Sequence, residues 1–185
     1  MSVVQKYNIH TAKEKNVNSD YFTGKVKIRE ILSEENSPEQ EMYHVTFYNG
    51  ALTSLHYHES DQILIATKGE GVVGLVEGSS VSKSVVDINS ITFLNEGDTV
   101  LIPANSIHFH GALNGQDFSH IAIMKMYKVN KEEKRVLDRA VTKWEYDLLS
   151  QEIHNGKETS EMDIMTAQEE IQAKIQMAIS KKLKM

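Results

Sequence analysis

The chain of 185 residues contains no cysteine. Disulfide bridges and thiolate metal sites are therefore excluded, and any metal ion must be bound by nitrogen and oxygen ligands. Only two prolines occur, Pro38 and Pro103, and both lie where we expect loops. No apolar run approaches the roughly 18 residues of a membrane-spanning helix, and the first six residues lack the apolar centre of a signal peptide. These absences predict a cytosolic protein with no membrane partner.

Basic residues are also in the minority. The chain has 20 Lys and Arg against 26 Asp and Glu, which gives a formal net charge of −6. A general nucleic-acid binder would normally present a basic patch, so we expect no nucleic-acid partner. The hydrophobic share of 40% is enough for the core of one compact domain with an appendage.

Short runs rich in Val, Ile, Thr, Phe and Tyr alternate with Gly and Asn from about residue 21 to residue 128. Such runs predict β-strands separated by turns. The predicted strands cover residues 25–28, 43–48, 52–58, 62–67, 72–76, 99–102 and 119–126. Residues 33–40 are predicted to form a loop, and residues 78–95 an insertion that could hold an extra hairpin at 81–88. Many short strands with frequent turns favour a sandwich or a closed barrel.

The last part of the chain has a helical pattern. The segments that begin at Thr142 and at Ser160 each resemble a capping box, which predicts two helix starts separated by a polar linker at residues 153–160. An apolar stripe at helical spacing is typical of a packing surface against the barrel or a partner subunit. Its members are Ile164, Ile171, Ile175, Ala178, Ile179 and Leu183. We expect residues 1–147 to form the β-domain and residues 148–185 a helical C-terminal extension.

Histidines occur in two pairs, His56-x-His58 and His108-x-His110. Residues i and i+2 of a strand point to the same face, so each pair can present two imidazoles to one metal ion. Gln62 follows four residues after His58, and its amide oxygen can aim at the same point if the strand resumes after a short bend. A single such pair is weak support for a metal site, but the joint spacing of both pairs is much stronger.

The spacing runs Gly50-x5-His56-x-His58-x3-Gln62-x6-Gly69 and is completed by Gly97-x5-Pro103-x4-His108. It resembles the two motifs of the cupin superfamily, at residues 50–69 and 97–114. The resemblance implies a mostly β, single-domain jelly-roll barrel. It also implies one divalent metal ion, bound by His56, His58, Gln62 and His108.

A narrower resemblance covers about residues 20–147. It rests on the segments 20–26, 108–112 and 141–146, and on Gln rather than Glu at Gln62. The chain is similar here to a group of small bacterial and archaeal cupins that includes manganese-dependent hydroxynitrile lyases and carboxymuconolactone decarboxylase-associated cupins. In that group a further histidine follows, which implies a catalytic acid/base role for His120. Phe109 replaces the group's usual Trp, Asn105 replaces a usual Gly, and residues 78–95 are longer than expected, so the substrate is left open.

Three imidazoles and a neutral amide would leave the double positive charge of a metal ion uncompensated. Such an ion is a strong Lewis acid for an anionic oxygen. Mn²⁺, Fe²⁺, Ni²⁺ and Zn²⁺ are all compatible with these ligands. His110 is a weaker candidate ligand because Gly111 suggests that its strand ends there. His10, His44 and His154 show no partner pattern and are expected at the surface.

Three functions remain open. The first is a metal-assisted lyase or decarboxylase in which His120 moves a proton. The second is a metal-dependent dioxygenase that holds oxygen and substrate together. The third is a non-catalytic sensor or binding protein for a small molecule, with the C-terminal helix passing the signal to a partner. We also expect a homodimer, with the N-terminal segment or the helix at residues 160–185 contributing to the interface.

Overall fold

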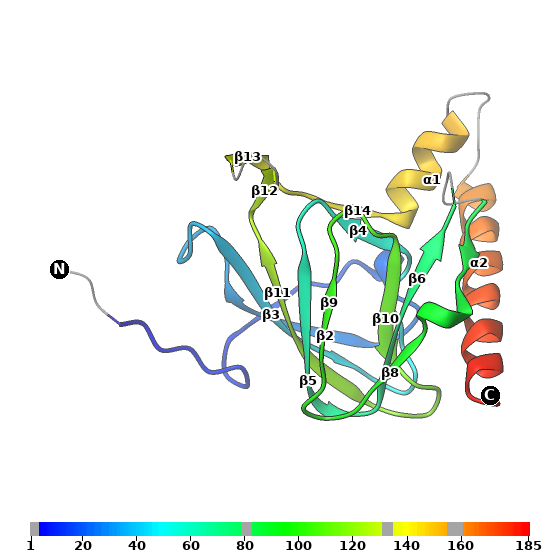
Figure 1. Cartoon of the computed structure of the whole chain (residues 1–185), viewed down its shortest axis with the longest axis horizontal. Helices are drawn as coiled ribbons and strands as arrows, with labels where there is room; N and C mark the ends of the chain where they lie inside the picture. Colours follow the sequence, from blue (N-terminus) through cyan, green and yellow to red (C-terminus); the bar gives the residue numbers. More distant parts are fainter. Residues whose placement is uncertain (1–3, 79–82, 131–134, 155–160) are drawn as a thin grey trace.

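The computed structural model describes residues 4–78, 83–130, 135–154 and 161–185, and it confirms a mostly β fold with a helical C-terminal segment (Figure 1). Within these ranges, neither α1 (Glu145–His154) nor α2 (Glu161–Lys182) has the length and apolar character to cross a membrane. The strands are β1 Lys13–Lys15, β2 Val26–Leu32, β3 Gln40–Phe47, β4 His56–His58, β5 Gln62–Gly69, β6 Gly71–Glu77, β7 Val85–Val86, β8 Thr92–Leu94, β9 Thr99–Ile102, β10 His108–Ala112, β11 Phe118–Lys125, β12 Tyr127–Asn130, β13 Arg135–Arg139 and β14 Thr142–Trp144. Two short 3₁₀ turns, η1 Ser19–Tyr21 and η2 Ile88–Ser90, complete the described elements.

Two antiparallel sheets form the walls of the barrel. The first has the strand order β1-β2-β3-β11-β5-β9, and the second has the order β14-β4-β10-β6-β7, with β8 also paired to β6. The hairpin of β12 and β13 is separate from both sheets. Because β4 and β10 are neighbours in the second sheet, the two histidine pairs meet there although about 50 residues separate them in the sequence.

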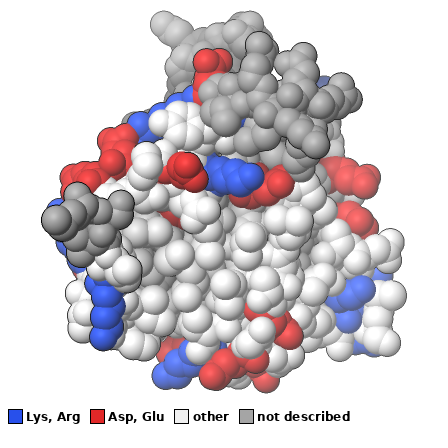
Figure 2. Space-filling model, turned by 60° about the vertical axis from the view of Figure 1, so that its left-hand side comes forward, with Lys and Arg blue, Asp and Glu red and all other residues white. Residues whose placement is uncertain are grey.

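The first sheet carries apolar side chains on both of its faces. Its outward row runs across four strands, because Leu101 pairs with Ile63, Ile63 with Ile123, and Ile123 with Met42. Leu101 is 62% exposed and Ile63 is 36% exposed. Sheets with one face in water normally alternate apolar and polar residues. Figure 2 shows a broad face of the molecule whose centre has few charged side chains.

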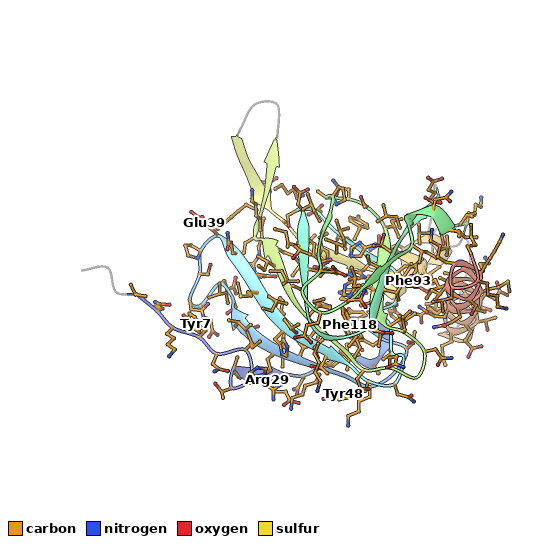
Figure 3. All side chains as sticks on the ribbon, turned by 60° about the horizontal axis from the view of Figure 1, so that its bottom comes forward. Tyr7, Arg29, Glu39, Tyr48, Phe93 and Phe118 are labelled. Atoms are coloured by element: carbon orange, nitrogen blue, oxygen red, sulfur yellow. The ribbon has the colours of Figure 1, made fainter. Side chains whose placement is uncertain are left out.

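The barrel interior is filled by a cluster of buried apolar side chains from both sheets. It includes Phe47 from β3, Leu64 from β5 and Phe118 from β11, and Figure 3 shows Phe118 inside the barrel. Gly71 is required beside Phe118, because a Cβ there would lie 2.6 Å from the ring. The interior is therefore tightly packed around Phe118.

The predicted strands are largely confirmed, with differences where the chain bends. Residues 99–102 match β9, but only His56–His58 of the predicted strand 52–58 lies in a ladder. Of the preceding residues, Leu52 and Thr53 form isolated bridges to Gly111 and Phe22, and Ser54 donates its N–H to the Tyr21 carbonyl. In the predicted insertion, β7 and β8 pair with β6 instead of forming a hairpin of their own, and residues 79–82 lie outside the described residues.

The C-terminal segment differs from its prediction at the start of α1. Thr142 lies in β14, which pairs with β4, so it is not a helix cap; the helix begins at Glu145. Ser160 lies outside the described residues. Five of the six residues in the predicted stripe of α2 are buried against the outer face of the second sheet. Leu183, the residue directly after the end of α2, is 57% exposed. The stripe is thus covered by this chain's own barrel.

Candidate metal centre

Three strands deliver the predicted ligand residues to one point of the barrel. His56 and His58 lie on β4, Gln62 is the first residue of β5, and His108 is the first residue of β10. His108 pairs directly with His56 across the second sheet. All four side chains are buried, with exposures between 0% for His108 and 7% for His58.

The ring nitrogens of His56, His58 and His108 form a compact group. One nitrogen from each ring lies within 4.8 Å of the others. The ring centres of His56 and His108 are 4.2 Å apart. The amide oxygen of Gln62 lies 3.1 Å from Nε2 of His108. The structure therefore brings together all four residues that the sequence motifs selected.

Each of the three imidazoles is held through Nδ1. Nδ1 of His56 lies 3.1 Å from the Ser54 carbonyl, and Nδ1 of His108 lies 2.8 Å from the Ser106 carbonyl. A carbonyl can only accept, so both rings carry their proton on Nδ1 and present the lone pair of Nε2. Nδ1 of His58 lies 2.8 Å from the Thr142 hydroxyl. Supports of this kind are typical of metal-binding histidines, whose orientation they set.

Burial keeps these rings neutral. Desolvation lowers the pKa of His58 to about 3 and that of His108 to about 4. The pKa of His56 is also lowered well below its usual value, first by burial and then by the neighbouring histidines. Neutral imidazoles are the form that binds a metal ion.

The donor set fits a cation. With its proton on Nδ1, His108 directs the Nε2 lone pair toward the amide oxygen of Gln62, while the Gln62 amide group donates toward the sulfur of Met124 at 3.6 Å. Two lone pairs that face each other repel, and a cation relieves this repulsion. Nε2 of His58 is buried and has no hydrogen-bond partner in the described part of the chain. Such orphaned buried acceptors are costly unless a ligand satisfies them.

Two further buried histidines, His110 and His120, lie beside this group. Their ring centres are 4.9 Å apart, and that of His110 is 5.3 Å from His56. Within the described residues, Nδ1 of His110 and both ring nitrogens of His120 lack hydrogen-bond partners. His120 shares the inward face of β11 with Ala122 and Met124, which the sequence left undecided. Burial lowers the pKa of His120 to about 3.

The cavity that contains these histidines has a volume of about 310 Å³. Its remaining wall is largely aromatic and aliphatic, with Phe22, Phe47 and Val45 among the lining side chains. Glu41 and Lys15 also line it. Polar nitrogen ligands at one side of an apolar cavity are typical of a site that orients a small organic molecule.

Sequence reasoning missed the residues that support the ligands. Trp144 stacks on His56 with ring centres 4.5 Å apart, and Thr142 contacts His58. The motif spacing gave no sign of them, because they come from β14, more than 80 residues later. His44 was expected at the surface but is 5% exposed, because His10 packs edge-on against it and Thr67 lies within hydrogen-bond distance.

Comparison with known proteins agrees with this fold. A family model described as Cupin matches residues 29–154. The chain belongs to the cupin family. It is 31% identical over 107 residues to an (R)-mandelonitrile lyase of Granulicella tundricola, which covers 58% of this chain and 73% of the relative.

Solved cupin structures resemble the fold. A cupin-like protein of Thermotoga maritima matches with a TM-score of 0.52 and 27% identity, over 77% of this chain and 88% of that one. A protein described as a predicted oxalate decarboxylase from the same organism matches with a TM-score of 0.52, over 65% of this chain and 98% of that one. Its identity is only 16%, so this likeness concerns the fold alone.

Proposed function

We propose that this cupin is a metal-dependent enzyme of lyase or decarboxylase type, with His56, His58, Gln62 and His108 holding one divalent cation. The observation that carries the proposal is the group of three neutral, Nδ1-anchored imidazoles with the Gln62 amide oxygen beside them. A divalent cation bound there would supply Lewis acidity for the oxygen of a substrate. Mn²⁺ is the first candidate because the resembling hydroxynitrile lyases use it.

His120 takes the role of proton acceptor in this proposal. A developing alkoxide or similar oxyanion requires that a nearby group remove a proton. His120 lines the cavity and is neutral, and no residue of the described chain forms a hydrogen bond with its ring nitrogens. His110 lies between His120 and His56, so it can orient the same substrate or pass the proton on.

The proposed substrate class follows from the apolar part of the cavity wall. Phe22 and Phe47 offer apolar aromatic surface, which suits the body of a small organic molecule with its oxygen directed at the imidazole group. The (R)-mandelonitrile lyase relative directs the first choice toward cyanohydrins, with 2-hydroxy acids second. Binding is therefore proposed to combine apolar contacts at one end with oxygen recognition at the other.

Trp144 provides a direct test of the cation site, because it is the single tryptophan of the chain and stacks on His56. We expect Mn²⁺ to quench its fluorescence with a stoichiometry near one, whereas Mg²⁺, which avoids imidazole ligands, should not. Cyanohydrins, 2-hydroxy acids and catechols are then screened with and without oxygen. Turnover that requires oxygen would replace the lyase by a dioxygenase, and tight binding without turnover would replace it by a sensor.

We also propose a homodimer built on the outward apolar row of the first sheet, Leu101, Ile63, Ile123 and Met42. The row leaves aliphatic surface in water, and a twofold axis over it would bury this surface on both copies. The N-terminal segment extends well beyond its own barrel in Figure 1, with Val4 96% exposed, which gives it the reach to lie on a second copy.

Light scattering tests this assembly. We expect about twice the chain mass of 20.9 kDa at micromolar concentration, and a monomer for Leu101→Glu with Ile63→Lys. A wild-type mass near that of one chain would contradict the dimer. The cytosolic location stays a prediction.

A further inference from the structure

Strand β4, which carries His56 and His58, is only three residues long and has unequal neighbours. On one side it pairs with β10 through the single pair of His56 and His108. On the other side it pairs with all three residues of β14. Most of the ladder support of the histidine pair therefore comes from β14, an edge strand whose Thr142 opens a segment with the spacing of a helix capping box.

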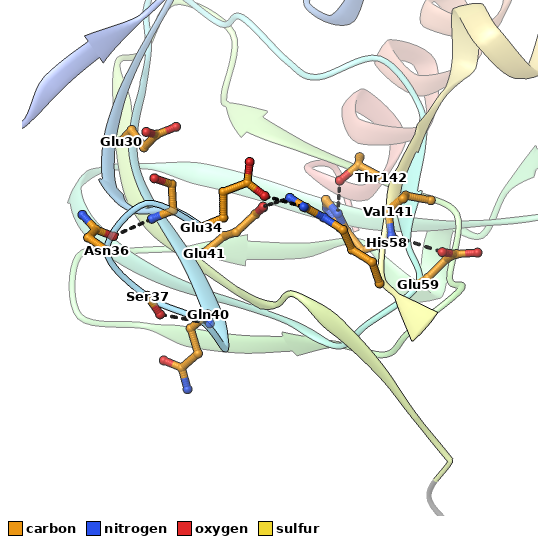
Figure 4. A network of polar contacts seen from close by, with 12 residues as sticks. Glu30, Glu34, Asn36, Ser37, Gln40, Glu41, His58, Glu59, Val141 and Thr142 are labelled. Atoms are coloured by element: carbon orange, nitrogen blue, oxygen red, sulfur yellow. Dashed lines mark hydrogen bonds and ion pairs between the residues drawn. The ribbon is translucent and has the colours of Figure 1, made fainter. Parts of the chain in front are cut away.

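Each end of the β4–β14 ladder is fastened by a reciprocal pair of hydrogen bonds that includes a glutamate carboxylate. Directly after His58, Glu59 donates its N–H to the Val141 carbonyl at 3.1 Å, and its carboxylate accepts the Val141 N–H at 3.1 Å (Figure 4). At the other end, Glu145 donates its N–H to the Leu55 carbonyl at 2.8 Å, and its carboxylate accepts the Leu55 N–H at 2.7 Å. The two pairs flank His56 and His58 closely.

The Glu145 pair is buried. Glu145 has no exposed surface, and burial raises the pKa of its carboxyl group to about 7. Burying a carboxyl group is unfavourable unless it makes good hydrogen bonds. Since Leu55 directly precedes His56, the bond to the Leu55 N–H fixes the backbone from which the first imidazole projects.

Between these two ends, β14 contacts both rings. The Thr142 hydroxyl lies 2.8 Å from Nδ1 of His58, as Figure 4 shows. Trp144 lies over the ring of His56 at 4.5 Å, and Tyr21 stacks on Trp144 at 4.4 Å with the planes 2° apart. Strand alternation explains the arrangement, because Thr142 and Trp144 share one face and stand opposite His58 and His56.

We propose that β14, with Glu59 and Glu145 at its ends, is the positioning element of the His56–His58 pair, and that Thr142 is the residue that orients His58. This inference rests on the proposed function, in which the two imidazoles bind a cation. In it, His58 donates its Nδ1–H to the Thr142 hydroxyl, so that its Nε2 lone pair faces His56 and His108. The segment from β14 onward thereby helps to position the site, in addition to packing on the outer face of the second sheet.

Thr142→Val and Thr142→Ser provide the matched test, because valine keeps the shape without the hydroxyl and serine keeps the hydroxyl. Calorimetric titration with Mn²⁺ should give a dissociation constant about 10–100-fold weaker for Thr142→Val. Thr142→Ser should stay within about 3-fold of wild type, as expected if the hydrogen bond is what matters. Wild-type affinity in a folded Thr142→Val protein would overturn the proposal.

A second measurement separates this inference from the proposed function. Nitrogen-15 NMR of the imidazoles in the metal-free protein reports which ring nitrogen carries the proton. We expect His58 of the wild type to be protonated on Nδ1, and this preference to be reduced in Thr142→Val. If the wild type binds no Mn²⁺, the proposed function fails, and the tautomer of His58 still decides the role of Thr142. A wild-type His58 protonated on Nε2 would overturn it.

The glutamate pairs are tested by Glu145→Gln and Glu145→Ala. Glutamine keeps an oxygen that can accept the Leu55 N–H, so we expect Mn²⁺ affinity within about 3-fold of wild type, whereas alanine leaves that N–H unsatisfied. If Glu145→Ala does not fold, Glu59→Ala at the exposed end replaces it, and its expected loss is about 10-fold. Unchanged Mn²⁺ affinity in a folded alanine variant would remove the glutamates from the proposal.

Discussion

Five buried histidines, four of which line the cavity, divide into two kinds. His56, His58 and His108 each have Nδ1 within hydrogen-bond distance of a carbonyl or hydroxyl oxygen. His110 and His120 have ring nitrogens for which the described chain supplies no partner. The same residue type, at similar burial, is thus held by hydrogen bonds at Nδ1 in one group and has unpartnered ring nitrogens in the neighbouring group.

The difference separates two chemical tasks. A metal ligand needs one tautomer and one ring orientation, because its lone pair must point at a fixed place. A proton carrier needs a nitrogen that can gain and lose a proton, and a permanent hydrogen bond at that nitrogen would oppose this exchange. The hydrogen bonds therefore divide the histidines into proposed ligands and a proposed base, independently of the motif spacing.

The largest effect is expected from removing two anchored rings. His56→Ala combined with His58→Ala should lower the metal content from about one ion per chain to the background, because only one imidazole and the Gln62 amide remain. Elemental analysis of purified protein measures it. His10→Ala, at an exposed histidine outside the cavity, is the control and should keep its metal. Metal retained by the double variant at the wild-type level would show that the anchored group is not the site.

Removing an unanchored ring should leave the metal content unchanged and lower the turnover rate. His120→Ala is expected to keep its metal and to lose about 10²–10⁴-fold in turnover, the usual range for general acid–base catalysis. Steady-state kinetics on the substrate found by screening, with elemental analysis of the same preparation, checks both halves. A wild-type rate would mean that His120 is structural.

Acid is expected to lower the free energy of unfolding through His120, one of the unanchored rings. Burial lowers the pKa of His120 to about 3, while the unfolded chain has the ordinary value of 6.5. Between these values the unfolded state binds more protons, so stability is full above pH 6.5 and falls as the pH drops toward 3. At pH 5 the loss from this group is on the order of 2 kcal/mol. Urea unfolding of wild type and His120→Leu at pH 7 and pH 5 measures it; a wild type that loses no more than the variant would contradict it.

The smallest effect is expected at Gln62. Gln62→Glu should keep the metal, because a carboxylate oxygen replaces the amide oxygen, but should weaken an anionic ligand by about tenfold, since one unit of positive charge is cancelled. Competition between azide and Mn²⁺-bound water, followed by relaxation of the water protons, measures the anion affinity. Gln62→Asn, which keeps the neutral amide on a shorter side chain, controls for a general disturbance. If Gln62→Glu bound the anion at least as strongly as wild type, the expected effect of the added negative charge would be contradicted.

The local sequence pattern was sufficient to predict several features of this protein. The pairing of His56 with His58 on one face follows from strand alternation, which any extended segment obeys. The span of β9 and the apolar stripe of α2 are equally local, because each depends on neighbours within a few residues. The absence of cysteine limits any metal site to nitrogen and oxygen ligands whatever the fold.

Long-range pairing decided the rest. The sequence left both faces of the His120 strand open, and only the packing of β11 between β3 and β5 turned that face inward. Thr142 and Glu145 have the spacing of a capping box, yet Thr142 became part of a strand because β4 offered it a free edge. The Glu145 carboxylate accepts the N–H of Leu55, 90 residues away. Local propensities are worth only fractions of a kcal/mol per residue, whereas satisfying a buried N–H is worth about 1–3 kcal/mol, so the tertiary contacts prevail.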